Sequence, residues 1–420
     1  MAFLTPTDLL HRLFETAVAA ADPMQVLPRV LGPRPPGRVV VIGAGKASAR
    51  MAETVESLWG PCEGLVITRY GHARPCQSIE IVEASHPVPD AAGVAATRRM
   101  LELLRRLAPG DFVLALISGG GSALLCAPAE GLALAEKQAV TAALLASGAP
   151  IEQINTVRKH LSAVKGGQLA AAAFPARMRA LLISDVAGDD PSFIASGPTV
   201  ADGSTPAEAL KILQDHGIEV PQKVLARLRA GSGVLAPGAF ALSRCETVIV
   251  AAPAQSLQAA AAFARGQGVA VRVQGDALTG EAADLGAKLA RMAQTYASAR
   301  RPGEPPLVLL SGGECTVSLR GNPGLGGPNV EFLLSALRTL DAAPGIWALA
   351  ADTDGVDGMA EVAGAVIGPD SLAKARARGL DPAAALAGHD AHRFFAALGT
   401  QVKPGPTLTN VNDFRAFLIL

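Results

Sequence analysis

The residues whose side chains could bind a ligand or take part in catalysis lie where apolar runs of the sequence end. Gly43-Ala44-Gly45-Lys46 follows the apolar run 38–42. Glycine lets backbone amides approach an anion, and the lysine adds positive charge beside the positive end of a helix dipole. A Walker loop would need Gly at position 40 and Ser or Thr at position 47, where this chain has Val40 and Ala47. A dinucleotide-binding fingerprint would need a third Gly at position 48, where this chain has Ser48. An anion site and a tight turn with a solvent-facing lysine both remain open.

A second glycine-rich loop, Ser118-Gly119-Gly120-Gly121-Ser122, follows the apolar run 112–117. Consecutive glycines can form a nest of amide donors around phosphate oxygens, with the two hydroxyls assisting. The alternative is a flexible hinge, because glycine loses much chain entropy when it is ordered. The loop predicts a phosphate site or a hinge.

Two further segments carry charge. The turn 184–190 packs three aspartates, of which Asp189 and Asp190 are the candidate ligands for Mg²⁺, which usually takes one or two carboxylates plus substrate phosphates. Ordinary Asp turn chemistry is the alternative. In the segment 155–165, Arg158 shares a helix face with Ser162 and Lys165. This face is either solvated or an anion site.

The last third of the chain has similar loops. Ser311-Gly312-Gly313-Glu314 ends an apolar run, and the glycine-rich segment 321–329, which includes Gly326 and Asn329, precedes a helical pattern. Both suit nucleotide phosphates at a helix N-terminus. The segment 352–358 resembles the first half of a calcium loop, but Ala363 stands where the bidentate Glu is required. We therefore reject an EF-hand and expect a polar loop at a strand end.

Alternating strands and helices must position these loops. Strands or apolar runs are expected at 38–42, 65–68, 79–82, 112–117, 180–183, 247–250, 269–273, 307–310, 346–350 and 414–420. Helices are expected at 6–20, before Trp59, and at 90–107, 255–265, 281–297 and 331–340. This alternation is typical of βαβ units and predicts an α/β protein with mainly parallel sheets. A Gly/Pro-rich stretch at 231–240 indicates two domains, 1–238 and 239–420.

Composition limits the class of partner. Lys and Arg total 37, as do Asp and Glu, and aromatic residues are 4% of the chain. The balance argues against a nucleic-acid clamp or a polybasic membrane anchor, and the scarcity of aromatics argues against base stacking. The five cysteines are dispersed and no uncharged apolar run reaches the ~18 residues of a membrane helix, so we expect reduced thiols in a cytoplasmic protein.

Taken together, the motifs of the whole chain form a recognisable series. In order these are Val41–Lys46, Ser85–Asp90, Ile117–Ser122, Ile154–Ser162, Ser184–Asp190, Leu310–Glu314, Ala351–Gly355 and Thr409–Asp413. The series closely resembles the glycerate 2-kinase family, whose C-terminal part is the MOFRL domain, here about residues 305–415. The resemblance implies two Rossmann-like domains with an active site in the cleft between them. It also implies transfer of the ATP γ-phosphate to the 2-hydroxyl of D-glycerate, with Mg²⁺.

Roles follow from this resemblance. Lys46 matches the catalytic lysine of the family, and we expect it at the transferring phosphate with the amides of Gly119–Gly121. Asp189 or Asp190 would hold Mg²⁺. The base stays open, with an aspartate of 185–190 preferred to His86 or His160. The candidate substrate residues are Ser85, His86, Asn155 and Arg158, since an Arg offers a carboxylate a bidentate fork.

Several points stay open at this stage. Many relatives have Arg where this chain has Pro328, which weakens any phosphate contact there, and Arg320 is a candidate substitute. The residues alone do not distinguish phosphorylation of position 2 from position 3, and homo-oligomerisation is open. Two rival functions are an NAD(P)H-dependent hydroxypyruvate reductase and a non-catalytic ligand sensor. The missing third glycine opposes the reductase, and Lys46 with the triple glycine and acidic loop opposes the sensor.

Overall fold

The computed structural model describes residues 4–319 and 324–420. Its contacts divide the chain into two compact units, one of Pro23–Val250 and one of Met1–Asp22 with Ala251–Leu420. The sequence predicted a different division, into 1–238 and 239–420. The two differences are the placement of the first helix and of the strand that follows residue 240.

Helix α1 (Pro6–Ala20) packs with the C-terminal part of the chain. Thr5 caps the helix by accepting a hydrogen bond from the Asp8 amide (3.1 Å), and Pro6 occupies its first turn. Its buried face, including Leu13 and Phe14, shares a core with α11 (Pro253–Gly266). An amphipathic pattern predicts the helix but not which sheet its apolar face will cover.

Strand β6 (Cys245–Ala251) completes the first sheet instead of opening the second unit. The preceding Gly/Pro-rich stretch also folds into the first unit. Its Leu235 amide donates to the carbonyl of Gly166 (2.9 Å), and Val234 lies against the same glycine. Because its backbone is hydrogen-bonded there, this stretch is not a free linker.

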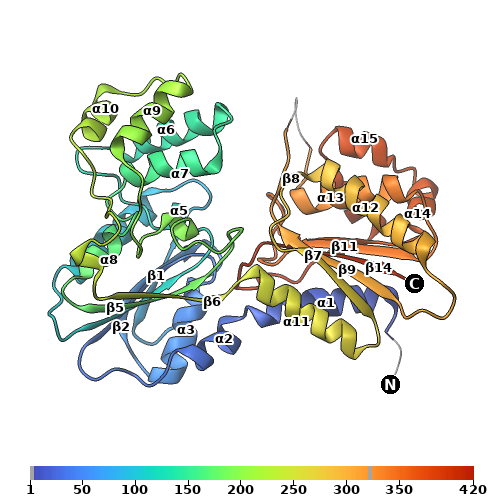
Figure 1. Ribbon diagram of the computed structural model, residues 1–420, viewed down its shortest axis with the longest axis horizontal. Helices are drawn as coiled ribbons and strands as arrows, with labels where there is room; N and C mark the ends of the chain where they lie inside the picture. Colours follow the sequence, from blue (N-terminus) through green and yellow to red (C-terminus); the bar gives the residue numbers. More distant parts are fainter. Residues whose placement is uncertain (1–3, 320–323) are drawn as a thin grey trace. The chain divides into compact units, whose positions relative to one another are not determined.

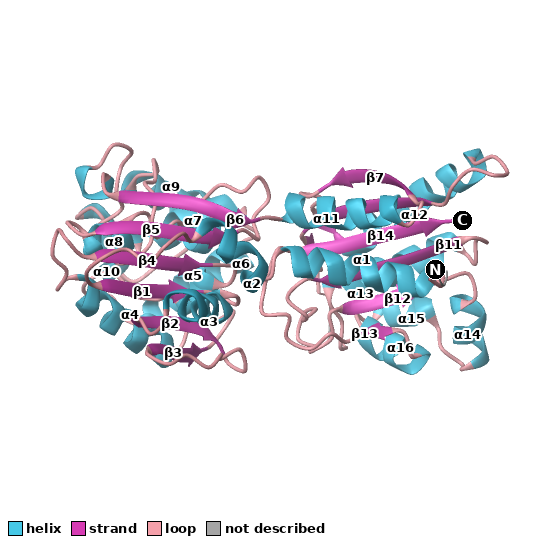
Figure 2. Cartoon of the chain, turned by 90° about the horizontal axis from the view of Figure 1, so that it is seen from below, coloured by secondary structure: helices cyan, strands magenta, loops and turns pink. Residues whose placement is uncertain are grey.

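The sheet of the first unit has the strand order β3-β2-β1-β4-β5-β6 (Figure 2). Its strands are β1 (Val39–Ala44), β2 (Glu63–Arg69), β3 (Ile79–Ala84), β4 (Phe112–Ile117), β5 (Arg177–Ile183) and β6. The pairs from β3 through β5 are parallel, which confirms the doubly wound arrangement expected here. In this register Ala44 lies opposite Ile117, so the loops after β1 and β4 start side by side.

Helices cover both faces of this sheet, and some of them form an additional layer (Figure 1). The helices are α2 (Pro23–Val30), α3 (Ser48–Trp59), α4 (Ala91–Leu104), α5 (Gly121–Leu124), α6 (Leu134–Ala146), α7 (Ile151–His160), α8 (Gln168–Ala173), α9 (Pro206–Asp215) and α10 (Gln222–Arg229). Short 3₁₀ turns occur at Ile194–Ser196 and Phe240–Leu242. Helices α6, α7, α9 and α10 enclose a small core of their own, which includes Leu144, Val157 and Leu213.

The second unit has a mixed sheet with the order β13-β12-β11-β14-β9-β7. Its strands are β7 (Ala270–Gly275), β9 (Leu307–Gly313), β11 (Ile346–Asp352), β12 (Gly364–Ile367), β13 (Gln401–Val402) and β14 (Asp413–Ile419), and β8 (Gly280–Glu281) pairs separately with β10 (Cys315–Thr316). The β7–β9 pair is parallel, whereas the four other pairs of this sheet are antiparallel. The expectation of mainly parallel strands therefore needs correction for this sheet. The final strand, β14, enters antiparallel between β9 and β11, and β12 follows β11 through a loop without a crossover helix.

Alternate residues of β9 show how this sheet is covered. Leu307 and Leu309 face one core, whereas Val308 and Leu310 face the other, which includes α1 and α11. The remaining helices of the unit are α12 (Ala282–Ala299), α13 (Pro328–Leu340), α14 (Ser371–Ala377), α15 (Pro382–Ala387) and α16 (Ala391–Leu398). Among the described residues, no helix combines the length and apolarity needed to cross a membrane.

Candidate functional site

The loops after β1 and β4 are locked together. Gly45 has a φ of +147°, and a Cβ there would lie 2.1 Å from the Ser118 Oγ. The Ala47 amide donates to the same Oγ (3.0 Å), and the Lys46 amide donates to the carbonyl of Gly119 (2.9 Å). The backbone of Lys46 is thus held at the edge of the sheet, beside the triple glycine, as the parallel strands predicted.

The Ser118 hydroxyl is committed to this junction, so Ser118→Ala should destabilise the fold. The substitution leaves the buried Ala47 amide without its acceptor, which costs about 1–3 kcal/mol. Urea unfolding measures the loss, and Ser57→Ala on the exposed face of α3 is the matched control. Unchanged stability combined with weaker ATP binding would instead assign the Ser118 hydroxyl to the ligand.

Gly120 brings two candidate side chains together. It has a φ of +77°, and a Cβ there would lie 3.1 Å from the His86 Cδ2 and 3.2 Å from the Lys46 Cγ. The next residue, Gly121, donates its amide to the Ser118 carbonyl (3.2 Å) and packs against Ala44 and Ala195. Lys46, His86 and the triple glycine therefore form one cluster at the carboxyl edge of the sheet.

The loop 194–197, whose sequence offers hydroxyl and amide donors, also reaches this cluster, because Ala195 lies against Gly121. Ala195 and Ser196 adopt left-handed conformations, with φ of 51° and 63°, which are strained for residues with a Cβ. The Ser196 Oγ lies 2.6 Å from the Ser122 Oγ. No motif predicts a left-handed alanine, so this contact was inaccessible from the sequence.

The acidic loop offers one oriented carboxylate. Asp189 has a φ of 55°, and its Oδ1 is buried with no hydrogen-bond partner among the described residues. Asp190 is exposed, and its Oδ1 accepts a hydrogen bond from the Ser192 amide (2.8 Å). A buried oxygen without a donor suits a cation, so Asp189 fits a Mg²⁺ ligand. The described part of the chain holds no group of three or more His, Cys, Asp and Glu that could bind a metal ion.

The predicted substrate residues of α7 also lie together. The Arg158 Nη1 donates to the Asn155 Oδ1 (3.5 Å), and burial lowers the pKa of Arg158. His160, which was a less favoured candidate base, is buried between Ser204 and Ser232, whose hydroxyls lie 3.1 and 2.7 Å from its ring nitrogens. Burial also lowers the pKa of His160, as expected for a neutral structural histidine.

The glycines predicted for the second unit allow close backbone approach. A Cβ on Gly313 would lie 2.2 Å from the Leu278 carbonyl oxygen, and one on Gly312 would lie 3.2 Å from that of Asp413. A Cβ on Gly326 would meet the His389 carbonyl at 2.7 Å. Glu314 of the same predicted set is exposed. Packing alone is enough to require glycine at positions 313 and 326, and a side chain at 312 would be tightly packed.

The N-terminus of α13 already faces a carboxylate of its own unit. The amides of Asn329 and Val330 donate to the two carboxylate oxygens of Asp357 (2.9 and 3.0 Å). Pro328 is the first residue of the helix, where a missing N–H has no cost. The predicted substitute Arg320 and the first three residues of the predicted loop, 321–323, lie outside the described residues.

A buried polar network connects this helix to β14. The Asn329 Nδ2 donates to the Asp413 Oδ1 (2.6 Å), and Arg415 forms an ion pair with the Asp413 Oδ2. Arg415 is fully buried, donates to the Cys315 Sγ (3.1 Å) and stacks on Phe332. Burial raises the pKa of Asp413, and the Arg415 charge opposes that rise. These buried contacts link helix α13 to strand β14.

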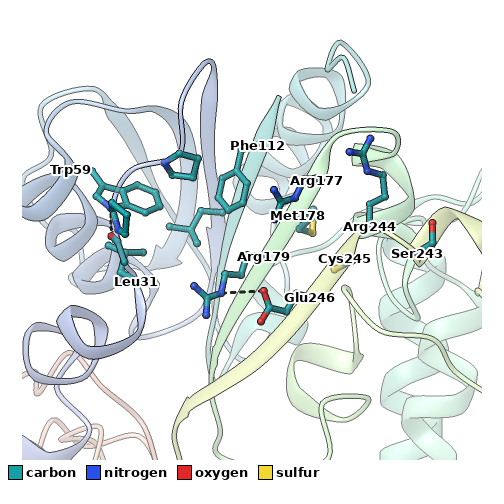
Figure 3. A pocket seen from close by; sticks show the side chains of 14 residues that line it. Leu31, Trp59, Phe112, Arg177, Met178, Arg179, Ser243, Arg244, Cys245 and Glu246 are labelled. Carbon is teal, nitrogen blue, oxygen red and sulfur yellow. Dashed lines mark hydrogen bonds and ion pairs between the residues drawn. The ribbon is translucent and has the colours of Figure 1, made fainter. Parts of the chain in front are cut away.

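Two cavities of similar size occur on opposite edges of the first sheet. One, of about 610 Å³, lies at the first residues of β4, β5 and β6, where Arg179 points toward Glu246 (Nε–Oε2, 3.4 Å) and Trp59 forms a wall (Figure 3). It contains none of the predicted site residues. The other, of about 560 Å³, includes Ser122 and Arg158 and lies at the carboxyl edge, where open α/β sheets bind ligands.

Comparisons with known proteins show the family to which the chain belongs. A family model described as a domain of unknown function, DUF4147, matches residues 9–229, and the MOFRL family model matches residues 307–413. A D-glycerate 2-kinase of Thermotoga maritima is 40% identical, with 91% of each chain covered. The crystal structure of a glycerate kinase from Thermotoga maritima superposes with a TM-score of 0.87 at 37% identity, covering 99% of both chains. The chain belongs to the glycerate 2-kinase family with a MOFRL domain.

One similar protein carries a different name. A protein of Agrobacterium vitis named "Putative hydroxypyruvate reductase" is 51% identical over 98% of this chain and 94% of its own length. This name corresponds to the rival function that the sequence left open.

Proposed function

We propose that this protein is an ATP-dependent glycerate kinase that phosphorylates D-glycerate, most simply at the 2-hydroxyl. The observation that carries the proposal is the cluster of Lys46, His86 and Gly120 at the carboxyl edge of β1 and β4. It combines a flexible cation with a glycine loop that anions can approach, in a chain 40% identical to a D-glycerate 2-kinase. Phosphoryl transfer depends mainly on such charge neutralisation and alignment.

Each of the predicted site residues has a proposed role in the reaction. Lys46 neutralises the transferring phosphate, and the amides of Gly119 and Gly120 hold its oxygens. Asp189 and Asp190 are the residues that would hold Mg²⁺, which would offset charge on the nucleotide phosphates. Arg158 and Asn155 bind the glycerate carboxylate, while Ser85 and His86 approach the substrate from the loop after β3. In the second unit, Gly312, Gly313, Glu314 and Gly326 are proposed to contact the nucleotide, whereas the predicted Asn329 already donates its amide to Asp357 and its side chain to Asp413.

The test is an assay of the purified protein with ATP, Mg²⁺ and either D- or L-glycerate. We expect ADP release that depends on D-glycerate, and ³¹P NMR of the product should show a phosphate ester on position 2. A phosphate on position 3 would retain the kinase and correct the position. The absence of ADP release with either enantiomer would refute the proposal.

The second candidate, a hydroxypyruvate reductase, rests on the name of the Agrobacterium vitis relative. The first residue of α3 argues against dinucleotide binding, because Ser48 is buried and its hydroxyl donates to the Leu116 carbonyl (2.8 Å) where the fingerprint needs a third glycine. The same preparation should leave NADH and NADPH unoxidised in the presence of hydroxypyruvate. Oxidation at a rate comparable to ADP release would favour the reductase.

A further inference from the structure

Helix α6 places an unused cation in the wall of the carboxyl-edge cavity. Lys137 lines this cavity of about 560 Å³ together with Ser122 and Arg158. The other lining residues are neutral, namely Pro87, Val88, Pro89, Leu134, Gln138, Ala139, Thr141, Ala142 and Leu145. The described lining residues therefore include two cations and no carboxylate to balance them.

The ammonium group of Lys137 lacks the partners that a buried charge requires. Lys137 is only 5% exposed, and its Nζ has no hydrogen-bond partner among the described residues. An unpaired buried ammonium is costly, so such groups normally pair or lose their proton. Burial lowers the pKa of Lys137 to about 8, and the charge of Arg158 lowers it further, with the nearby Cys126 acting in the opposite direction.

The two other buried lysines of the described chain show what structural lysines do here. Lys159, 3% exposed, forms an ion pair with Asp202. Lys165, fully buried, donates to the carbonyls of Ser122 (2.8 Å) and Ala195 (3.5 Å). Both are satisfied within the fold, whereas Lys137 is not. Lys137 therefore differs from them in that its ammonium group has no hydrogen-bond partner among the described residues.

The cavity adjoins the proposed phosphate-transfer cluster. Its wall includes Pro87, the neighbour of His86, and Ser122, the neighbour of the triple glycine. The side chains of His86 and Lys46 both lie close to the space that a Cβ on Gly120 would occupy. A small acid whose carboxylate lay between Lys137 and Arg158 would therefore have its remaining atoms close to the residues that handle phosphate.

We infer that Lys137 and Arg158 form a two-cation subsite for the carboxylate of the acceptor acid, with Lys137 as an unassigned specificity-determining residue. The inference rests on the proposed function for the identity of the acid as a hydroxy acid. A nucleotide phosphate is the other anion that two cations would attract. Of the described lining residues, Arg158 is the one proposed to bind the glycerate carboxylate, and no glycine of the proposed phosphate loops lies in this wall, so the carboxylate is the assigned occupant.

The first test compares Lys137→Met with Lys159→Met in the full-length protein. Lys137→Met should raise KM for D-glycerate by about 10- to 100-fold, the range of a lost hydrogen bond to a charged group, and leave KM for ATP unchanged. Its melting temperature should equal or exceed that of the wild type, because an unpaired buried charge has been removed. Lys159→Met should instead lower the melting temperature, because it leaves Asp202 buried without its partner, and leave KM for D-glycerate unchanged.

A pH profile separates a binding charge from a packing role. The groups that face Lys137 are Arg158 of α7, Cys126 and the buried Lys165. Since the protonated lysine binds the carboxylate, KM for D-glycerate should rise as the pH increases through about 8 in the wild type. Lys137→Met should lose this rise, and Lys137→Arg should restore low KM while keeping it independent of pH in this range. A rise that persists in Lys137→Met would overturn the inference.

Calorimetric titration with D-glycerate in the absence of ATP separates this inference from the proposed function. Binding to the wild type but not to Lys137→Met supports the subsite even if no phosphate is transferred. Turnover of D-glycerate with equal KM in both proteins refutes the subsite and leaves the kinase standing. An equal rise in KM for ATP assigns the cations to the nucleotide, and the absence of D-glycerate binding to the wild type also overturns the inference.

Discussion

Lys46→Met should lower kcat for D-glycerate phosphorylation by about 10²–10³-fold, the effect of removing one group that stabilises charge in the transition state. The side chain of Lys46 lies beside Gly120 and His86, whereas its backbone is held independently by the Gly119 carbonyl. The substitution therefore removes the charge and leaves the loop in place. Steady-state kinetics with ATP and D-glycerate measure the loss, and circular dichroism with thermal melting should show an unchanged fold.

Lys374→Met is the matched control for this experiment. Lys374 is an exposed lysine of α14 that pairs with Asp370 one helical turn away, an interaction of little energetic weight. It should retain the kcat of the wild type. A Lys46→Met protein with the kcat of the control would remove Lys46 from the mechanism and with it the central argument for the site.

Arg415→Met should lower the free energy of unfolding of the second unit by about 3–5 kcal/mol, because it leaves the Asp413 carboxylate buried without its partner. Both side chains are buried, with 0% and 7% of their surfaces exposed, so solvent screens this pair little. Trp347 of β11 reports on this unit, and Trp59→Phe removes the other tryptophan of the chain. Urea unfolding followed by Trp347 fluorescence in that background measures the loss.

The destabilisation of Arg415→Met should shrink as the pH falls. Burial already raises the pKa of Asp413, and loss of the Arg415 charge raises it further. A carboxyl group whose folded-state pKa exceeds its unfolded value of about 3.9 binds its proton more tightly in the folded state, so stability rises as the pH falls toward that value. Asp413→Asn combined with Arg415→Met should recover much of the stability at neutral pH. If Arg415→Met alone were as stable as the wild type, the ion pair between Arg415 and Asp413 would not contribute to stability.

The strand-end loops of the first unit were predictable because parallel strands end at one edge. Once 38–42 and 112–117 are recognised as strands, their following loops must lie close, and the register of Ala44 opposite Ile117 shows this. The position of β14 in the sheet was harder to predict. An apolar run at the end of a chain predicts a strand, but its insertion between β9 and β11 depends on contacts between segments distant in sequence.

Single residues of the site were the hardest to predict. Lys137 stands between Glu136 and Gln138 and has the sequence context of an exposed lysine, yet the helical layer buries it. Similarly, the amides of Asn329 and Val330 are those of a promising anion site, until the fold supplies Asp357 from 27 or 28 positions further along the chain. Burial determines the environment of Lys137, and a long-range contact with Asp357 determines that of the α13 amides. Neither effect can be recognised in the neighbouring sequence.

The membership of α1 in the second unit has a consequence during protein synthesis. The helix is synthesised well before its partner α11, which begins only at Pro253. At roughly 5–20 residues per second, the intervening ~230 residues take on the order of 10–50 seconds to translate. During that interval the apolar stripe around Leu13 and Phe14 has no native surface to cover it, while the entire first unit emerges and can fold. The nascent chain therefore carries an uncovered apolar stripe throughout this interval, and the second unit is completed only after β14 has been synthesised.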